Sequence, residues 1–391
     1  MATIFYLSSM PFDFLVQRPQ ELCLQLADQD FQCCYIYRYP LRNIVKSSYK
    51  KDLSIMKRTP PNIDIESVVM LPRRLSGFGG DMLLKQAEGK LVKKKIASLV
   101  HKYDSPRIAI VSDWGWAPYV NRNWFDLVIY DFIDDLEVFQ FANDSLRRLA
   151  DQYHNLLLTE SDCVLVTANP KLRNEAEVKG ARNILTVGNG VNCQYFQQQA
   201  QSTAGQEMTQ EFKSRAAGPI VGYLGAIYEW FDLTLVLESA RQCPNAQFLL
   251  AGPISPTVSA MISSRSVPDN VLFSGQVAKD HVPSLLAAFD IALIPFRPGV
   301  IAEGTDPIKL YEYFMWGKPV VSTQMPALQP YEKLGLLKMA DTSVQFADHI
   351  KAYINDPGDE SVVRMRQEIA YSNDWSQKAQ IIIDYIKQKL G

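Results

Sequence analysis

The chain has 391 residues, of which 47% are hydrophobic and 21% charged, and its formal net charge is −2. This near-neutral balance argues against a general nucleic-acid binder, which needs a basic surface. No apolar run approaches the ~20 residues that span a bilayer. We expect a cytoplasmic protein, because the chain enters a strand at once without the basic start of a signal peptide. The six cysteines form no CxxC pair, which favours a reducing compartment and gives no sign of a metal cluster.

Short apolar runs alternate with helical patterns through the first half of the chain. The predicted strands cover residues 3–8, 33–37, 68–71, 108–111, 127–130 and 163–166, and helices are predicted over 17–27 and about 144–159. Acidic residues follow two of these strands. They are Asp113 after the fourth, and Asp131, Asp134 and Asp135 after the fifth.

The alternation begins again in the second half. Strands are predicted over 219–225, 248–252, 270–274, 290–295 and 319–322, with helices over 233–241, 306–316 and 375–390. Between the halves, residues 197–218 are rich in Gln, Ser, Thr and Ala, and we predict a linker region there. The sequence therefore predicts two doubly wound α/β domains, over residues 1–195 and 205–374, with one large sheet as the alternative.

The stretch 305–321 predicts a short helix between two buried strands. Asp306 can cap this helix, Pro307 suits its first position, and Gly317 followed by Pro319 ends it. Strand, loop, helix and strand form a βαβ unit, which implies a parallel sheet.

Lys309 and Glu312 are the charged exceptions on this mostly apolar helix, and because they are three apart they share one face. A lysine in the first turn opposes the helix dipole unless it faces an anion. Helix N-termini at the carboxyl edge of a parallel sheet commonly hold phosphates. A carboxylate one turn further on can accept hydrogen bonds from sugar hydroxyls. The pair therefore suits a ribose diphosphate, with a surface ion pair as the alternative.

Six lysines gather in a predicted helix that has an apolar stripe: Lys85, Lys90, Lys93, Lys94, Lys95 and Lys102. A basic amphipathic helix can rest on an anionic membrane surface. Such a run is more often a solvated face backed by core contacts, and the sequence leaves both interpretations open.

Five stretches form a recognisable set: QRPQEL at 17–22, YDFIDD at 130–135, GNGVN at 188–192, GYLGAIYEWFD at 222–232, and residues 290–321. With them, the chain resembles a GT-B-fold glycosyltransferase of the group 1 (family four-like) class over nearly its whole length. Within that class it resembles the branch that makes bacterial cell-surface polysaccharides. The resemblance implies two Rossmann-like domains facing a cleft, with helix 375–391 crossing back to the N-terminal domain.

In this class the C-terminal domain holds the nucleotide-sugar and the N-terminal domain receives the acceptor. By resemblance, Glu312 would bind the ribose and Lys309 the diphosphate. Gly222 and Gly225 would let the backbone approach the phosphates, with a plain tight turn as the alternative for each. The remaining donor-side residues so implied are Gln276 and Val277 along the base, Tyr311, and Arg297.

The chain also departs from the class pattern. The class commonly has two acids separated by seven residues, but the expected first position is a glycine, with Glu303 one residue off. After the first strand of the C-terminal domain the class often has Arg and Lys for the diphosphate, whereas residues 228–232 here are Tyr, Glu, Trp, Phe and Asp. Lys309 would then take over that duty, with Arg297 as a helper.

Glycosyl transfer builds charge on the departing diphosphate, and cations and helix N–H groups stabilise that charge without a metal. No DxD-like motif is convincing, and Asp131 and Asp134 do not have that spacing. An inverting enzyme would also need a base for the acceptor hydroxyl, and we choose Asp131 or Asp134. A retaining enzyme would use these acids to orient sugar hydroxyls, and capping is the structural alternative.

Three further residues are expected on the acceptor side. Asp113 ends a strand that points to the predicted cleft, and Trp114 after it would stack on a sugar. Arg18 would contact a phosphate, or pair with Glu21 at the surface.

We therefore predict a hexosyltransferase-type glycosyltransferase without metal or other cofactor. It would transfer a sugar from a nucleotide-sugar, with UDP as the preferred nucleotide, to a saccharide or lipid-linked acceptor. Its expected location is the cytoplasm, at the inner face of the membrane if the lysine-rich helix binds lipid. The alternatives are a sugar-nucleotide 2-epimerase of the same fold, and a non-catalytic nucleotide-sugar-binding subunit.

Overall fold

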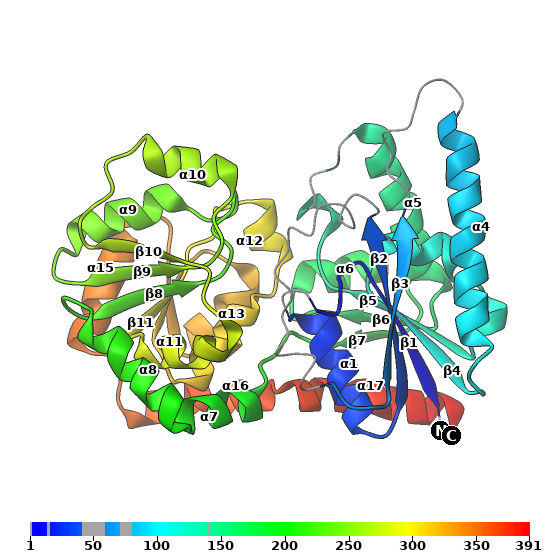
Figure 1. Ribbon diagram of the computed structural model, residues 1–391. Coiled ribbons are helices and arrows are strands. Elements are labelled where there is room, and N and C mark those ends of the chain that lie inside the picture. The colour runs from blue at the N-terminus through cyan, green and yellow to red at the C-terminus, as the bar shows by residue number, and fades with distance from the viewer. Residues whose placement is uncertain (1, 14–15, 41–58, 71–79, 139–140, 142) are drawn as a thin grey trace. The chain divides into compact units, whose positions relative to one another are not determined.

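The computed structural model describes residues 2–13, 16–40, 59–70, 80–138, 141 and 143–391. The chain divides into two compact units (Figure 1). The first comprises Met1–Thr167, Lys171–Val187 and Trp375–Gly391, and the second comprises Ala168–Pro170 and Gly188–Asp374.

The first unit is built on a seven-stranded parallel sheet of order β3-β2-β1-β4-β5-β6-β7. Strands β1, β5 and β6 are apolar runs that are buried along their whole length, as expected of a sheet covered on both faces. The strands are β1 Thr3–Ser8, β2 Gln32–Pro40, β3 Ile63–Met70, β4 Arg107–Val111, β5 Leu127–Phe132, β6 Cys163–Val166 and β7 Ile184–Thr186. Leu71, predicted at the end of a strand, lies outside the described residues.

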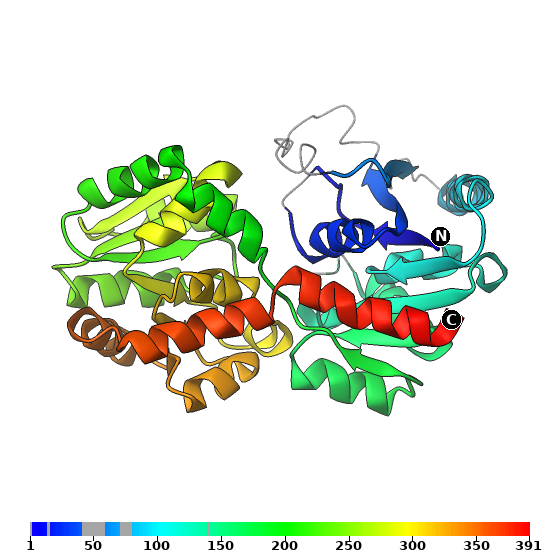
Figure 2. The ribbon, with the colours of Figure 1, turned by 90° about the horizontal axis from the view of Figure 1, so that it is seen from below.

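Helices cover both faces of this sheet. On one face, four helices pack in one core with Phe5 and Leu7 of β1. They are α4 (Gly80–Val100), the short helix η1 (Trp114–Tyr119), α5 (Asp144–Glu160) and α6 (Pro170–Val178). Tyr6 points to the other face, where α1 (Arg18–Asp28) lies and packs against α17 (Trp375–Leu390) (Figure 2). Phe5, Tyr6 and Leu7 alternate between the faces because consecutive side chains of a strand point to opposite sides of the sheet.

The second unit contains a six-stranded parallel sheet of order β10-β9-β8-β11-β12-β13, flanked by helices. Its strands are β8 Ile220–Leu224, β9 Gln247–Ala251, β10 Val271–Gly275, β11 Ile291–Ile294, β12 Val320–Thr323 and β13 Leu337–Ala340. Its helices are α7 Cys193–Gln201, α8 Thr203–Ser214, α9 Leu233–Gln242, α10 Pro256–Ser263, α11 Val282–Ala288, α12 Val300–Gly304, α13 Ile308–Met315, α14 Gln329–Lys333, α15 Ser343–Asn355 and α16 Glu360–Ser372.

The prediction of two doubly wound α/β domains is confirmed. In both sheets the strand order reverses once, between β1 and β4 and between β8 and β11. The carboxyl ends of strands on either side of such a reversal are where open α/β sheets bind ligands.

The predicted linker is wrong. Most of residues 197–218 form the end of α7 and all of α8, and both helices pack on α11 of the second unit. The polar composition misled the prediction because these are amphipathic surface helices. Ser202 begins α8 by accepting a hydrogen bond from the Gly205 N–H at 3.1 Å.

All six cysteines are free and buried. Among the described residues, no helix is both long and apolar enough to cross a membrane.

Candidate functional site

Helix α13 begins at Ile308, one residue later than the predicted cap would place it. Pro307 is the N-cap residue, and no side chain caps the helix. Asp306 is buried and accepts hydrogen bonds from the backbone N–H groups of Asn189 at 2.8 Å and Ala168 at 3.3 Å. The expected capping role of Asp306 is therefore wrong, because its carboxylate instead ties two loops to the start of α13.

Tyr311 also lies away from any ligand surface. Its ring is buried, and its hydroxyl donates to the Asp306 carboxylate at 3.1 Å. The prediction that Tyr311 binds the donor is wrong, because its one polar group is used inside the unit.

Lys309, in the first turn of α13, is only half-buried and lies at the reversal point of the sheet. Its Nζ is 5.7 Å from the ring centre of Tyr223 on β8 and 6.0 Å from that of Phe296, which follows β11. Within the part of the chain that the structure describes, Lys309 forms no ion pair or hydrogen bond. The surface ion pair with Glu312 that the sequence left open is thus not formed.

The surroundings of Lys309 disfavour its charge. Desolvation lowers the pKa of Lys309 from its ordinary value, and the Glu312 carboxylate on the same face of α13 opposes this shift. Glu312 is half-buried. An incoming anion would restore the stabilisation that Lys309 has lost, so this position is suited to an anionic ligand.

Glycines stand at three adjacent strand ends on this edge. Gly225, Gly252 and Gly275 have φ values of +147°, +145° and +71°, which side chains rarely adopt. A Cβ on Gly225 would lie 2.6 Å from the Lys309 Nζ. Gly225 therefore has no side chain because the Lys309 amine occupies that space. Sequence reasoning missed Gly252, although its place directly after β9 was a signal.

Position 222 is a glycine for a different reason. It lies inside β8, paired with β9 and β11, and a Cβ there would overlap the ring of Phe289. The predicted approach of phosphates to Gly222 is wrong, because a core side chain fills that space.

The other donor-side residues lie on loops at the same edge. Gln276 is exposed directly after β10, while Val277 packs against the core. Arg297 is exposed after β11, and its backbone N–H donates to the Trp230 carbonyl at 2.7 Å. This bond places Arg297 next to the 228–232 turn, where cations are absent.

In the first unit, Asp131 is an internal counter-ion. Its carboxylate forms an ion pair with Arg18 at 2.7 Å and accepts from the Tyr6 hydroxyl at 3.0 Å. Arg18 also donates to the Val187 carbonyl at 2.8 Å, and both charged side chains are at most 2% exposed. The predictions of Asp131 as a base and of Arg18 as a surface or acceptor-side group are wrong, because each neutralises the other in the core.

Asp113 and Trp114 keep partial exposure at the carboxyl end of β4. Asp113 begins η1 by accepting from the Gly115 N–H at 2.9 Å, and it pairs with Arg38 of β2. Trp114 lies 6.1 Å from the ring of Phe141, with part of its surface accessible. The two aromatic rings offer a surface for stacking.

After β5, the two remaining acids differ in their surroundings. Asp135 is buried and pairs with Lys171 at 2.6 Å, whereas Asp134 is half-buried. Of the two predicted bases, only Asp134 stays at the edge.

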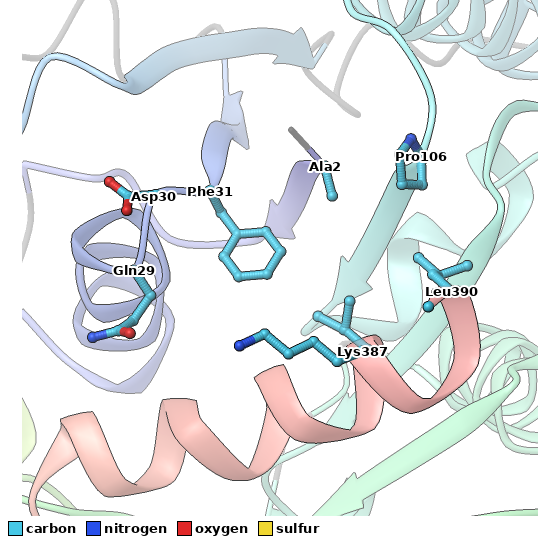
Figure 3. A pocket seen from close by; sticks show the side chains of 9 residues that line it. Ala2, Gln29, Asp30, Phe31, Pro106, Lys387 and Leu390 are labelled. Carbon is cyan, nitrogen blue, oxygen red and sulfur yellow. The ribbon is translucent and has the colours of Figure 1, made fainter.

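A separate hollow of about 330 Å³ lies in the first unit, between the end of α1 and the end of α17 (Figure 3). Ala2, Phe31 and Pro106 line it, and each directly precedes a strand. The hollow is thus at the amino edge of the sheet and contains none of the predicted site residues.

Residues 218–356 match the family model described as Glycosyl transferases group 1. These residues of the second unit are therefore similar to the group 1 glycosyl transferases. It is also 26% identical over 262 residues to TuaH of Bacillus subtilis (strain 168), assigned as a teichuronic acid biosynthesis glycosyltransferase. That alignment covers 64% of this chain and 64% of the length of TuaH.

The fold of this chain is shared with solved structures. A sucrose-phosphate synthase from Thermosynechococcus elongatus aligns with a TM-score of 0.72 at 16% identity, over 99% of both chains. HepE of Anabaena, in complex with UDP, aligns with a TM-score of 0.67 at 17% identity, over 99% of this chain and 100% of that one. The resemblance to a GT-B glycosyltransferase of group 1 is therefore confirmed.

The Asp131→Asn substitution should destabilise the protein, because it leaves the Arg18 guanidinium buried without its counter-ion. The expected cost is about 3–5 kcal/mol, measured by denaturant unfolding. In the matched control, Glu177→Gln breaks the exposed pair with Arg173, and its cost should stay under about 1 kcal/mol. Equal and small costs would show that Asp131 is not an internal counter-ion.

The Lys309→Met substitution should stabilise the protein when no ligand is present, because it removes a desolvated charge. The pKa of Lys309 is lower in the folded state than in the unfolded state. The charged amine therefore lowers the free energy of unfolding by its full amount below the folded-state pKa. This destabilisation disappears as the pH rises towards the unfolded-state pKa of about 10.4. The difference in Tm between Lys309→Met and the unsubstituted protein should therefore shrink from pH 7 to pH 10. A difference that grows with pH would contradict the lowered pKa.

Proposed function

We propose that the protein transfers a sugar from a UDP-sugar to a saccharide or lipid-linked saccharide during surface polysaccharide synthesis. The observation behind this proposal is the Lys309 amine at the reversal point of the second sheet, beside the Gly225 turn and with Glu312 on the same helix face. One curated relative and one structural neighbour support the finer points. HepE has been solved with UDP and with UDP-glucose, and TuaH is assigned to teichuronic acid synthesis.

In the proposed reaction, the bond between the anomeric carbon and the diphosphate breaks as the acceptor oxygen bonds to that carbon. Negative charge then grows on the leaving diphosphate. The Lys309 ammonium and the N-terminal N–H groups of α13 stabilise this charge, and the aromatic rings around Lys309 keep water away, so the interaction is stronger than in bulk water. This scheme needs no metal ion.

Glu312 would accept hydrogen bonds from the two ribose hydroxyls, one turn along α13 from the diphosphate. Gln276 would lie along the base after β10, and Arg297 would add positive charge beside the turn that lacks it. These contacts bind the donor in its ground state as well as in the transition state, so they set affinity more than turnover.

The first unit would receive the acceptor. With Asp131 used internally, Asp134 is our choice for the base that takes the acceptor proton if the reaction inverts the anomeric centre. If the reaction retains it, Asp134 and Asp113 would orient hydroxyls, and Trp114 with Phe141 would stack on a sugar ring.

Glu312→Ala should weaken UDP binding by roughly 10- to 100-fold, because a carboxylate hydrogen bond is worth about 1.5–3 kcal/mol. Isothermal titration with UDP measures this directly. Glu368→Ala, at an exposed position on α16, is the matched control and should bind UDP normally. Unchanged affinity in Glu312→Ala would contradict the donor assignment.

Product analysis separates the proposed activity from its alternatives. A transferase releases UDP from a UDP-sugar only when a saccharide acceptor is present. Free epimerised nucleotide-sugar would indicate an epimerase instead, and normal UDP affinity without turnover for a panel of acceptors would indicate a binding subunit.

We also propose that α4 rests on an anionic membrane surface at the cytoplasmic face. Val92, Ile96 and Leu99 are buried against the first unit. The opposite side of the helix exposes Leu91, at 63%, among lysines. These are Lys90, Lys93, Lys94 and Lys95, the last of which pairs with Glu66 at 2.8 Å. The side chain of Lys85 lies outside the described residues, and Lys102 follows the end of α4.

Replacing Lys90, Lys93 and Lys94 with Gln should weaken binding to phosphatidylserine-containing vesicles by about 100-fold, since each surface lysine contributes roughly 1 kcal/mol. Vesicle sedimentation measures it. A control replaces the exposed Lys387 and Lys389 of α17 with Gln and should bind as before. Equal binding by both variants would exclude α4 as the contact.

A further inference from the structure

We infer that Gly252 is a positioning residue for donor binding, because it sets the place of the Gly225 turn against which the Lys309 amine lies. The inference rests on the proposed function, since it names the residue that fixes the position of the lysine proposed to bind the diphosphate. Gly252 does not itself reach Lys309. Its effect passes through the backbone of Gly225.

The first contact is between Gly252 and Gly225. Gly252 directly follows β9 with φ of +145°. A Cβ on Gly252 would overlap the carbonyl oxygen of Gly225 and lie 2.6 Å from its carbonyl carbon. These are backbone atoms, so they cannot rotate away as the end of a flexible side chain does. A side chain at position 252 must therefore displace the turn.

Hydrogen bonds hold the two segments side by side. The Gly225 N–H donates to the Ala251 carbonyl at 2.8 Å, and the Ile227 N–H donates to the Pro253 carbonyl at 2.9 Å. The Ser255 N–H donates in turn to the Ile227 carbonyl at 3.2 Å. Residues 225–227 thus continue the pairing of β8 with β9 beyond the ends of both strands, and the turn has little freedom to adjust.

The second contact is between Gly225 and Lys309. The space that a Gly225 side chain would occupy is filled by the Cε and Nζ atoms of Lys309. The rings of Tyr223 and Phe296 lie close to the same amine. A displaced turn therefore changes the position of the ammonium or the space beside it. Glycine at position 252 lets the Gly225 turn lie close to β9, and glycine at position 225 leaves the space that the Lys309 amine occupies.

The test is Gly252→Ala in the full chain, measured by isothermal titration with UDP. Gly335→Ala is the matched control. Gly335 lies in the same unit, has φ of +72°, and would place its Cβ in open space, with nothing within 4 Å. The control therefore adds a methyl group at a positive φ in the same unit without the collision. We expect Gly252→Ala to weaken UDP binding at least about tenfold, and Gly335→Ala to leave it unchanged within about twofold, because a misplaced contact forfeits most of its binding contribution.

A double-mutant cycle with Lys309→Met decides whether Gly252 acts through the lysine. If it does, Gly252→Ala has almost no further effect on UDP affinity once Lys309 is methionine. An equal loss in both backgrounds, wild-type affinity in Gly252→Ala, or a failure of Gly252→Ala to fold while Gly335→Ala folds would each overturn the inference. A failure of the unsubstituted protein to bind UDP would instead overturn the proposed function.

Discussion

The second unit places a lysine amine at a point where the protein gives its charge little compensation. Lys309 lies between two aromatic rings and a glycine turn, and the Glu312 carboxylate only partly offsets the desolvation that lowers the pKa of Lys309. Such an arrangement destabilises the free protein, and it is found at functional sites, where binding of a ligand offsets the destabilisation. Much of the surrounding structure can be understood as support for that one group.

Both ends of α13 are fixed by buried charged residues. At its start, Asp306 accepts two backbone N–H bonds from neighbouring loops. At its end, the buried guanidinium of Arg366 donates to the carbonyls of Leu336 at 2.9 Å, Gly317 at 3.1 Å and Pro357 at 3.2 Å. A cation at a helix C-terminus also complements the helix dipole. Helix α13 is only eight residues long, so these anchors, more than helix propensity, hold it in place.

The sequence predicted the parallel sheets well, because buried parallel strands appear as continuous apolar runs. It predicted less about the acids at their ends. Asp131 and Asp134 follow the same strand, yet one pairs with Arg18 in the core and the other stays at the edge. Nothing local distinguishes them, because the partner of Asp131 is 113 residues away. Gly222 and Gly225 present the same difficulty, since only the positions of Phe289 and Lys309 explain why each is a glycine.

In the proposed function, the Lys309 amine holds the diphosphate of the donor. A crystal structure of the protein with UDP would measure the distance between the Lys309 Nζ and the nearest diphosphate oxygen. We expect a direct charge-assisted hydrogen bond of about 2.7–3.2 Å, with the phosphate beside Gly225. UDP bound with its diphosphate beyond about 6 Å from that amine, out of reach of any direct or water-bridged contact, would contradict it.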